Sequence, residues 1–129
     1  MSFKWEVRIR FVDTDASGRI HYTAMLRYFE AAEFEFLRSR GVSYHGFPDF
    51  GFPRVHVECD YMGATKCDDL LSIGVEVARV GTSSFTYAFE ATGAGRALAK
   101  GKITVVCLAR ETGRPVALPE AFRHALTSG

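Results

Sequence analysis

The sequence predicts an α+β domain in which a five-stranded antiparallel sheet wraps around one long central helix. Only one long segment, residues 23–40, carries apolar residues at helical spacing. Five other segments alternate apolar and polar residues, as strands with one buried face do. Short turns separate the later segments, which favours antiparallel pairing. With 129 residues, of which 47% are hydrophobic, the chain suits one domain, residues 1–129, with one core.

The first strand is expected over residues 5–11, because its alternate residues are apolar: Trp5, Val7, Ile9 and Phe11. The helix follows from Thr23 to about Arg40. Gly41 comes directly after the last turn of this helix, as a C-terminal cap glycine would. Apolar residues occupy more than one stripe of the helix, so we expect it to be buried on most sides.

Residues 42–52 contain two glycines and a proline and predict a loop with one short turn. Four strand-like runs follow, at about residues 54–61, 71–77, 84–91 and 96–109. Gly93-Ala94-Gly95 predicts a hairpin turn, and Gly101 predicts a bulge or bend within the last run. A short terminal helix is expected from Pro119 to Leu126. The unpaired edges of such a sheet predict pairing with a second copy of the chain.

Composition argues against several classes of protein. The formal net charge is +1, and no basic tract suggests a nucleic-acid partner. The first residues lack the apolar run of a signal peptide, and no window approaches the roughly 20 apolar residues of a membrane span. The cysteines Cys59, Cys67 and Cys107 form neither an even framework nor a CxxC pair. We therefore expect a cytoplasmic protein with reduced thiols and no metal site.

The segment Phe11-Val12-Asp13-Thr14-Asp15-Ala16-Ser17-Gly18-Arg19-Ile20-His21-Tyr22 is the strongest candidate site. It places two carboxylates, a glycine and a His-Tyr pair directly before the long helix. A carboxylate that faces the positive end of a helix dipole can attack a polarised carbonyl, or deprotonate a water that attacks it. In an extended segment Asp13 and Asp15 would project to the same side, which would raise the pKa of one of them. The alternative is that both aspartates are turn residues that bond local amides.

On these residues the chain resembles the hotdog-fold thioesterases of the 4-hydroxybenzoyl-CoA thioesterase family, over nearly its whole length. The motifs are Asp13-Thr14-Asp15-Ala16-Ser17-Gly18 with the aromatic pair after it, Leu26-Arg27-Tyr28-Phe29-Glu30-Ala31-Ala32, Gly81-Thr82-Ser83-Ser84-Phe85, and Gly113-Arg114-Pro115 with Leu118-Pro119. The resemblance implies a hotdog fold and a homodimer or tetramer with acyl-CoA sites at the subunit interface. It also implies no metal and no cofactor, since CoA is part of the substrate. Arg19 and the order His21-Tyr22 depart from the family pattern at the expected acyl pocket, so the acyl group stays open.

The resemblance also implies roles for individual residues. Asp15 matches the catalytic aspartate, acting as nucleophile or as general base for water, whereas Asp13 is expected to be a local structural residue. The backbone N–H of Tyr22 would polarise the thioester carbonyl. Gly18 would supply a backbone geometry that other residues resist and let the thioester approach closely, unless it is a plain turn glycine. His21 is expected to line the pocket or orient nearby groups rather than to act as an acid or base.

Other candidate residues have ordinary structural explanations as well. Ser83 and Ser84 resemble a family position near the active-site water or carboxylate, although serines at strand starts are usually turn residues. Glu30 or Glu33 would be the alternative catalytic carboxylate, but helix glutamates are usually solvated or ion-paired. Four cations could reach the CoA phosphates: Arg54, Arg79, Arg96 and Lys100.

Together these observations predict an acyl-CoA thioesterase that hydrolyses acyl-CoA to free acid and CoA. One alternative is a thioesterase that acts on acyl carrier protein thioesters. A second alternative is a hotdog dimer that binds acyl-CoA without cleaving it. A hotdog dehydratase would need a histidine–carboxylate pair, and His56, the only histidine on an expected strand, has no apparent partner in the sequence.

Overall fold

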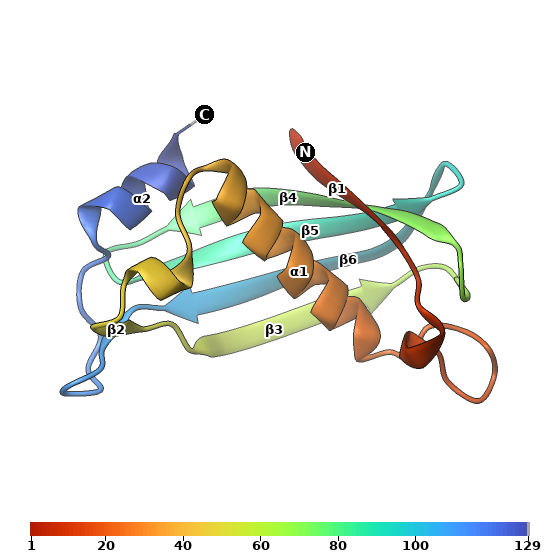
Figure 1. The fold of residues 1–129 in the computed structure, drawn as a ribbon, viewed down its shortest axis with the longest axis horizontal. Helices are drawn as coiled ribbons and strands as arrows, with labels where there is room; N and C mark the ends of the chain where they lie inside the picture. Colours follow the sequence, from red (N-terminus) through yellow and green to blue (C-terminus); the bar gives the residue numbers. More distant parts are fainter. Residues whose placement is uncertain (129) are drawn as a thin grey trace.

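The structure, a computed structural model, describes residues 1–128 (Figure 1). In chain order its elements are β1 (Phe3–Arg8), the 3-10 helix η1 (Phe11–Asp13), α1 (Ala24–Ser39), the 3-10 helix η2 (Tyr44–Gly46), β2 (Phe50–Gly51), β3 (Arg54–Tyr61), β4 (Leu70–Val80), β5 (Ser84–Gly93), β6 (Arg96–Val106), β7 (Leu108–Ala109) and α2 (Glu120–Thr127). No helix among these residues is long and apolar enough to cross a membrane.

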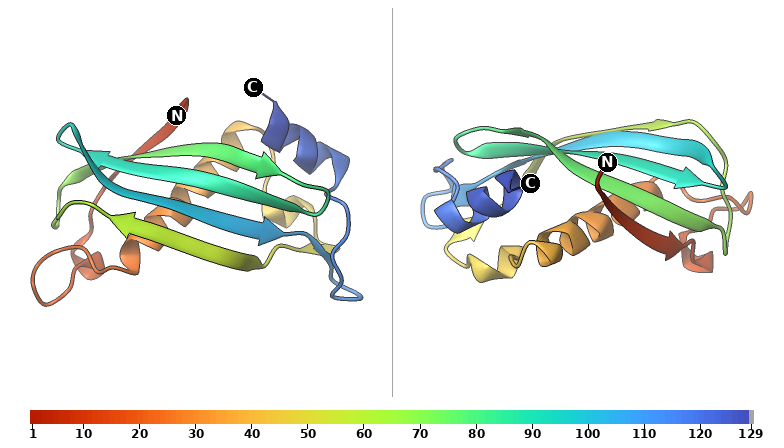
Figure 2. Two further views of the ribbon diagram at one scale, coloured as in Figure 1. Left: turned by 180° about the vertical axis from the view of Figure 1, so that it is seen from behind. Right: turned by 90° about the horizontal axis from the view of Figure 1, so that it is seen from above.

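A five-stranded antiparallel sheet in the order β1-β4-β5-β6-β3 forms one layer, and α1 lies across one of its faces. Seen from above in Figure 2, the sheet curves over the helix. This is the predicted hotdog arrangement, and the expected long helix and four later strands are confirmed. The edge strands of the sheet are β1 and β3. A separate two-stranded sheet pairs β2 with β7.

The core lies between the inner face of the sheet and the buried face of α1. Phe29, which is fully buried, stacks on Phe89 of β5 with ring centroids 4.8 Å apart. Gly101 of β6 makes room for this ring, because a Cβ there would lie 2.7 Å from Phe29 Cε2 and 2.7 Å from the carbonyl oxygen of Glu58. The register of β6 is regular at Gly101 against both β3 and β5. The predicted bulge is therefore wrong: the glycine serves close packing of helix on sheet.

Two turns use glycines as the sequence predicts. Gly41 has φ +78°, its N–H bonds the Arg38 carbonyl at 3.1 Å, and the Val42 N–H bonds the Leu37 carbonyl at 3.1 Å. These two bonds are the Schellman pattern that ends α1. In the β5–β6 hairpin, Ala94 and Gly95 have φ angles of 51° and 75°, the left-handed geometry of a tight hairpin turn.

The structure differs from the prediction at the first and last strands. Phe11 lies in η1 and not in β1, and its side chain is 80% exposed. The chain turns there because the Asp13 N–H bonds back to the Arg10 carbonyl at 2.9 Å. The last predicted run is divided at Cys107 into β6 and β7, because β7 leaves the main sheet to pair with β2. The loop prediction for residues 42–52 missed β2.

The two ends of the sheet carry different connections (Figure 1). At the end where α1 begins, the loop after η1 meets the β3–β4 connection: the Ile20 N–H bonds the Thr65 carbonyl at 2.9 Å, and Arg19 pairs with Lys66 in an antiparallel bridge. The β5–β6 hairpin lies at the same end. We call this the α1-start end. The far end carries β2, β7, α2 and the β4–β5 turn.

Candidate active site

The candidate site is built on the loop of residues 14–20, which leads from η1 to the start of α1. An antiparallel bridge between Thr14 and Ile20 closes this loop at its base. Within it the Asp15 N–H bonds the Arg19 carbonyl at 2.8 Å, and the Gly18 N–H bonds the Asp15 carbonyl at 3.0 Å. Gly18 has φ +83°, which confirms that it supplies a backbone geometry other residues resist, and the space around its Cα is open.

Asp15 presents an exposed carboxylate that is held by its own loop. Its Oδ1 accepts hydrogen bonds from the Ser17 N–H at 2.8 Å and from the Ser17 hydroxyl at 2.5 Å. These two bonds lower the pKa of Asp15 below its ordinary value of 3.8. The carboxylate is therefore ionised at neutral pH, and Oδ2 accepts no hydrogen bond from residues 1–128.

Asp13, in contrast, points into the protein and ties the loop to α1. Its Oδ2 accepts a hydrogen bond from the Tyr28 hydroxyl at 2.6 Å, and its Oδ1 lies 2.6 Å from Arg27 Nη1. Its backbone carbonyl accepts the His21 N–H at 2.8 Å. Asp13 thus has the structural position expected of it.

The predicted coupling of the two aspartates is wrong, because the pKa values of both are lowered. Burial raises the pKa of Asp13, but the hydrogen bonds from Tyr28 and Arg27 outweigh that effect. Asp13 is 3% exposed and Asp15 is exposed to solvent, so the two carboxylates belong to different environments.

The backbone N–H of Tyr22 is available to a ligand. It donates to no acceptor among residues 1–128, whereas the preceding N–H, that of His21, is bonded to Asp13. The Tyr22 carbonyl accepts a hydrogen bond from the hydroxyl of Tyr61, at the end of β3. An unpaired N–H directly before the first turn of a helix is a natural donor to a developing oxyanion.

The His21 ring packs beside this peptide unit. It stacks on the ring of Tyr22 with centroids 4.7 Å apart, and its Nδ1 lies 2.7 Å from Thr23 Oγ1. Nδ1 also accepts the Thr23 N–H at 3.1 Å. These contacts hold the His21 ring at the start of the helix, and the orienting role expected from the sequence stays a prediction.

A pocket of about 260 Å³ opens beside Tyr22. It is lined by Arg19, Ile20, Tyr22, Tyr61, Gly63, Ala64 and Thr65. The residues from the β3–β4 connection were missed by sequence reasoning, because they follow Tyr22 by about 40 positions and carry no motif of their own. Asp15 is not part of this wall in the single chain, since its carboxylate is turned onto Ser17.

Several predicted site residues lie at the far end of the sheet. Arg79 is the penultimate residue of β4 and donates from Nη2 to the Ser84 hydroxyl at 3.0 Å. The Ser83 carbonyl accepts the Cys107 N–H at 2.7 Å. Because β4 and β5 run the length of the sheet, the structure does not bring these residues to Asp15 within one chain.

Arg54 is held in a buried ion pair with the central helix. Its Nη1 lies 2.6 Å from Oε1 of Glu33, which is fully buried, and its Nη2 lies 3.8 Å from Glu30. Tyr44 donates to the other oxygen of Glu33, and its hydroxyl lies 3.1 Å from that of Tyr87. Burial raises the pKa of Glu33, while Arg54 opposes the shift. Arg54 is therefore not free for CoA phosphates, and Glu33 is ion-paired as helix glutamates usually are.

The expectation that His56 lacks a partner is wrong. His56 Nε2 lies 2.9 Å from Oε1 of Glu58, two residues along β3. Residues two apart on a strand share a face, which sequence spacing alone could have shown. Both side chains are more than half exposed, at 59% and 55%, and neither lines the pocket beside Tyr22.

The donor groups of this site suit carbonyl chemistry. Among residues 1–128, no group of three or more histidine, cysteine, aspartate or glutamate side chains is arranged to hold a metal ion. What the α1-start end does offer is an ionised carboxylate at Asp15 and, at Tyr22, an N–H that is unpaired among residues 1–128 and lies beside a pocket lined by the β3–β4 connection. Such a combination can polarise a carbonyl and attack it, directly or through water.

Comparison with known proteins agrees with this chemistry. A family model described as the thioesterase superfamily matches residues 17–100. The chain is 30% identical over 129 residues to the acyl-CoA thioesterase YbgC of Haemophilus influenzae, covering 95% of each chain. It is 30% identical over 125 residues to a 1,4-dihydroxy-2-naphthoyl-CoA hydrolase of Synechococcus sp., covering 92% of this chain and 95% of that one.

Solved structures show the same fold. The 1,4-dihydroxy-2-naphthoyl-CoA thioesterase from Synechocystis superposes with a TM-score of 0.93 at 24% identity, covering 98% of this chain and 96% of that one. A protein from Aquifex aeolicus superposes with a TM-score of 0.90 at 26% identity, covering 96% of this chain and 98% of that one.

Proposed function

We propose, from the premise that this chain belongs to the thioesterase superfamily and is a thioester hydrolase, that it cleaves acyl-CoA to free acid and CoA with Asp15 as the catalytic carboxylate. One observation carries the proposal. A single short loop holds an ionised carboxylate at residue 15 and leads to an unpaired backbone N–H at Tyr22, beside a pocket.

The proposed reaction uses these two groups in different ways. The Tyr22 N–H bonds the thioester carbonyl oxygen and stabilises the negative charge that develops there. Asp15 attacks the carbonyl carbon to form a mixed anhydride, which water hydrolyses after CoA has left, releasing the free acid and restoring the Asp15 carboxylate. Alternatively, Asp15 removes a proton from a water that attacks the carbonyl carbon and gives the free acid directly. The lowered pKa of Asp15 keeps it ionised in either role. CoA then leaves as a thiolate, which needs little help because a thiol pKa is only about 8.5.

The CoA substrate is supported by the relatives. The acyl-CoA thioesterase of Haemophilus influenzae and the 1,4-dihydroxy-2-naphthoyl-CoA hydrolase of Synechococcus sp. both match this chain over more than nine-tenths of its length. The first is named for acyl-CoA in general and the second for one aromatic acyl group, and both are named for CoA as the carrier. We therefore assign acyl-CoA as the substrate class and leave the acyl group to experiment.

A second copy of the chain completes the proposed site. Large apolar side chains are exposed on the edge strand β3 and directly after it, in η1, and at Tyr22. They are Val55, Val57, Tyr61, Met62, Phe11, Val12 and Tyr22. An unpaired edge with such side chains favours association. If β3 pairs with the partner's β3 in the antiparallel sense, the far end of one sheet comes beside the α1-start end of the other. Ser83, Ser84 and Arg79 would then act across the interface, near the Asp15 of the other subunit.

The test is a panel of short, long, branched and aromatic acyl-CoAs, assayed for thiol release with a chromogenic thiol reagent. The same acyl groups are presented on acyl carrier protein. We expect turnover on at least one acyl-CoA, with kcat/KM at least tenfold higher than on the matched carrier protein. Preference for the carrier protein would reassign the substrate class. Tight CoA binding with no thiol release from either series would support the non-catalytic alternative.

A further inference from the structure

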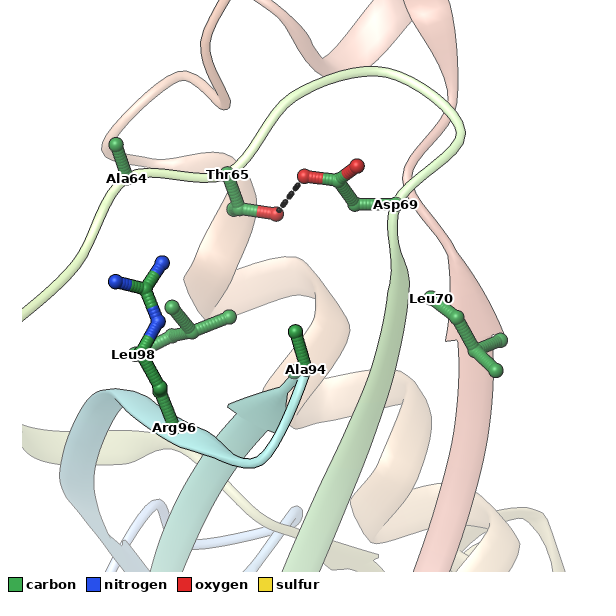
Figure 3. Close-up of a pocket in the computed structure, with 8 residues that line it drawn as sticks. Ala64, Thr65, Asp69, Leu70, Ala94, Arg96 and Leu98 are labelled. Carbon is green, nitrogen blue, oxygen red and sulfur yellow. Dashed lines mark hydrogen bonds between the residues drawn. The ribbon is translucent and has the colours of Figure 1, made fainter.

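Three cations from separate segments converge beside the pocket at the α1-start end. Arg19 of the site loop, Lys66 of the β3–β4 connection and Arg96 of the β5–β6 hairpin line one hollow of about 290 Å³, together with Ala64, Thr65 and Asp69. Figure 3 shows the Arg96 guanidinium reaching from the hairpin toward Ala64 and Thr65. This hollow shares Arg19, Ala64 and Thr65 with the pocket that contains Tyr22.

These three cations lack side-chain partners within the part of the chain that the structure describes. All three residues are exposed, and none of their side chains forms a hydrogen bond or ion pair with residues 1–128. Arg19 and Lys66 also face each other across an antiparallel bridge. Like charges directly opposite on paired strands repel, so this arrangement weakens the loop unless an anion lies between them.

Asp69 is the one acidic residue among those that line this hollow. Its carboxylate is hydrogen-bonded within its own turn. Its Oδ2 accepts a hydrogen bond from the Thr65 hydroxyl at 3.0 Å (Figure 3). The same oxygen accepts the Lys66 N–H at 3.0 Å. The backbone bond from Lys66, together with that from Thr65, lowers the pKa of Asp69. One ionised carboxylate against three cations leaves the hollow positively charged, in a chain whose net charge is only +1.

We propose that Arg19, Lys66 and Arg96 form a subsite for an oxyanion carried by the substrate at a distance from the thioester, namely a phosphate of the CoA nucleotide. This inference rests on the proposed function. Two guanidinium groups match the oxygens of a phosphate by paired hydrogen bonds, and the lysine adds a compact charge. A carboxylate at the end of the acyl group has the same chemistry and would be the second source of such an anion.

The position of the subsite suits a group remote from the reacting bond. Arg19 precedes Tyr22 by three residues, so their Cα atoms are at most about 11 Å apart. The hollow adjoins the Tyr22 pocket at Arg19, Ala64 and Thr65 and extends to Lys66 and Arg96, which do not line that pocket. A thioester carbonyl bonded to the Tyr22 N–H would therefore leave an extended substituent lying along the β3–β4 connection, with its terminus among the three cations.

The experiment compares thioesters of one neutral acyl group on CoA, on 3′-dephospho-CoA and on pantetheine, with succinyl- or glutaryl-pantetheine as the carboxylate arm. The variants are Arg96→Gln and Lys66→Gln. Lys4→Gln is the matched control, since Lys4 is an exposed lysine of β1 away from the hollow. We expect Arg96→Gln and Lys66→Gln each to raise KM for acyl-CoA about tenfold, with kcat little changed. The KM for the neutral acyl-pantetheine stays within twofold of the unmodified protein, and Lys4→Gln shifts neither value.

The results distinguish a CoA phosphate from an acyl carboxylate as the source of the anion. They also distinguish failure of the subsite from failure of the proposed hydrolysis. If Arg96→Gln and Lys66→Gln raise KM only for succinyl- or glutaryl-pantetheine, the oxyanion subsite is confirmed. The anion that it binds is then the carboxylate of the acyl group. A KM for acyl-CoA within twofold of the unmodified protein would overturn the subsite, as would an equal rise on the neutral acyl-pantetheine. Calorimetric binding of CoA and of pantetheine gives the same comparison without turnover. Failure of the proposed hydrolysis would therefore not be mistaken for failure of the subsite.

Discussion

Replacing Tyr28 by phenylalanine removes one hydroxyl that fixes the site loop to α1. That hydroxyl donates to Asp13 Oδ2 at 2.6 Å and accepts the Arg10 N–H at 3.1 Å. Arg10 is exposed, so water can bond its N–H in the variant. Asp13 is buried and keeps only Arg27. The cost is therefore that of a lost hydrogen bond to a buried charged group, about 1.5–3 kcal/mol of unfolding free energy.

The same substitution has a definite pH dependence. The folded pKa of Asp13 lies below its unfolded value of 3.8, so its bonds stabilise the fold above about pH 4 and that stabilisation is lost as the pH falls through the folded pKa. Without the Tyr28 bond the folded pKa of Asp13 rises. The difference in unfolding free energy between the unmodified protein and Tyr28→Phe is therefore largest near pH 7 and becomes smaller as the pH falls below 4.

Urea unfolding at pH 7 and at pH 3 measures this difference, with Tyr22→Phe as the matched control because the Tyr22 hydroxyl is exposed and bonds nothing among residues 1–128. The control should change stability by less than about 0.5 kcal/mol. A loss below 0.5 kcal/mol for Tyr28→Phe at pH 7 would refute the reasoning. An equal loss of unfolding free energy at both pH values would refute it too. Such a result would indicate altered packing rather than the loss of a hydrogen bond to the ionised Asp13 carboxylate.

Three further substitutions test other parts of the account. Gly101→Ala should cost about 1–3 kcal/mol in urea unfolding, because its Cβ would meet Phe29 and the Glu58 carbonyl; an unchanged midpoint would contradict the close packing. Gly18→Ala should cost about 1 kcal/mol from its φ of +83°, and a stabilised variant would show that the loop lacks this geometry. Tyr61→Phe should lower kcat/KM about tenfold by freeing the Tyr22 carbonyl, whereas unchanged kinetics would remove Tyr61 from the site.

The sequence predicts the parts of the fold that repeat locally. The helical period of α1, the alternation of β3 to β6, the cap at Gly41 and the hairpin at Gly93–Gly95 are all set by near neighbours in the chain. Phe11 and Gly101 escaped prediction for a shared reason. The turn at Phe11 directs Asp13 inward to bond Tyr28, 15 residues later, and the ring of Phe29 from the distant helix packs against Gly101.

The candidate site divides in the same way. The loop that holds Asp15 and Gly18 is continuous in sequence and could be identified from it. The wall around Thr65 could not, because it joins the loop only through the pairing of Ile20 and Arg19 with the β3–β4 connection. Arg54 appeared to be a free cation because nothing local reveals that Glu33, 21 positions earlier, is buried beneath it.

The most direct test of the central claim is the single-turnover rate of Asp15→Asn on the best acyl-CoA of the panel. Asparagine keeps the shape of the side chain and an oxygen for the Ser17 bonds, so the fold should be retained in urea unfolding. We expect the rate to fall at least about 100-fold. Tyr22→Phe, which preserves the backbone N–H, should stay within a few-fold of the unmodified enzyme. A folded Asp15→Asn protein that hydrolyses acyl-CoA within tenfold of the unmodified rate would contradict the assignment.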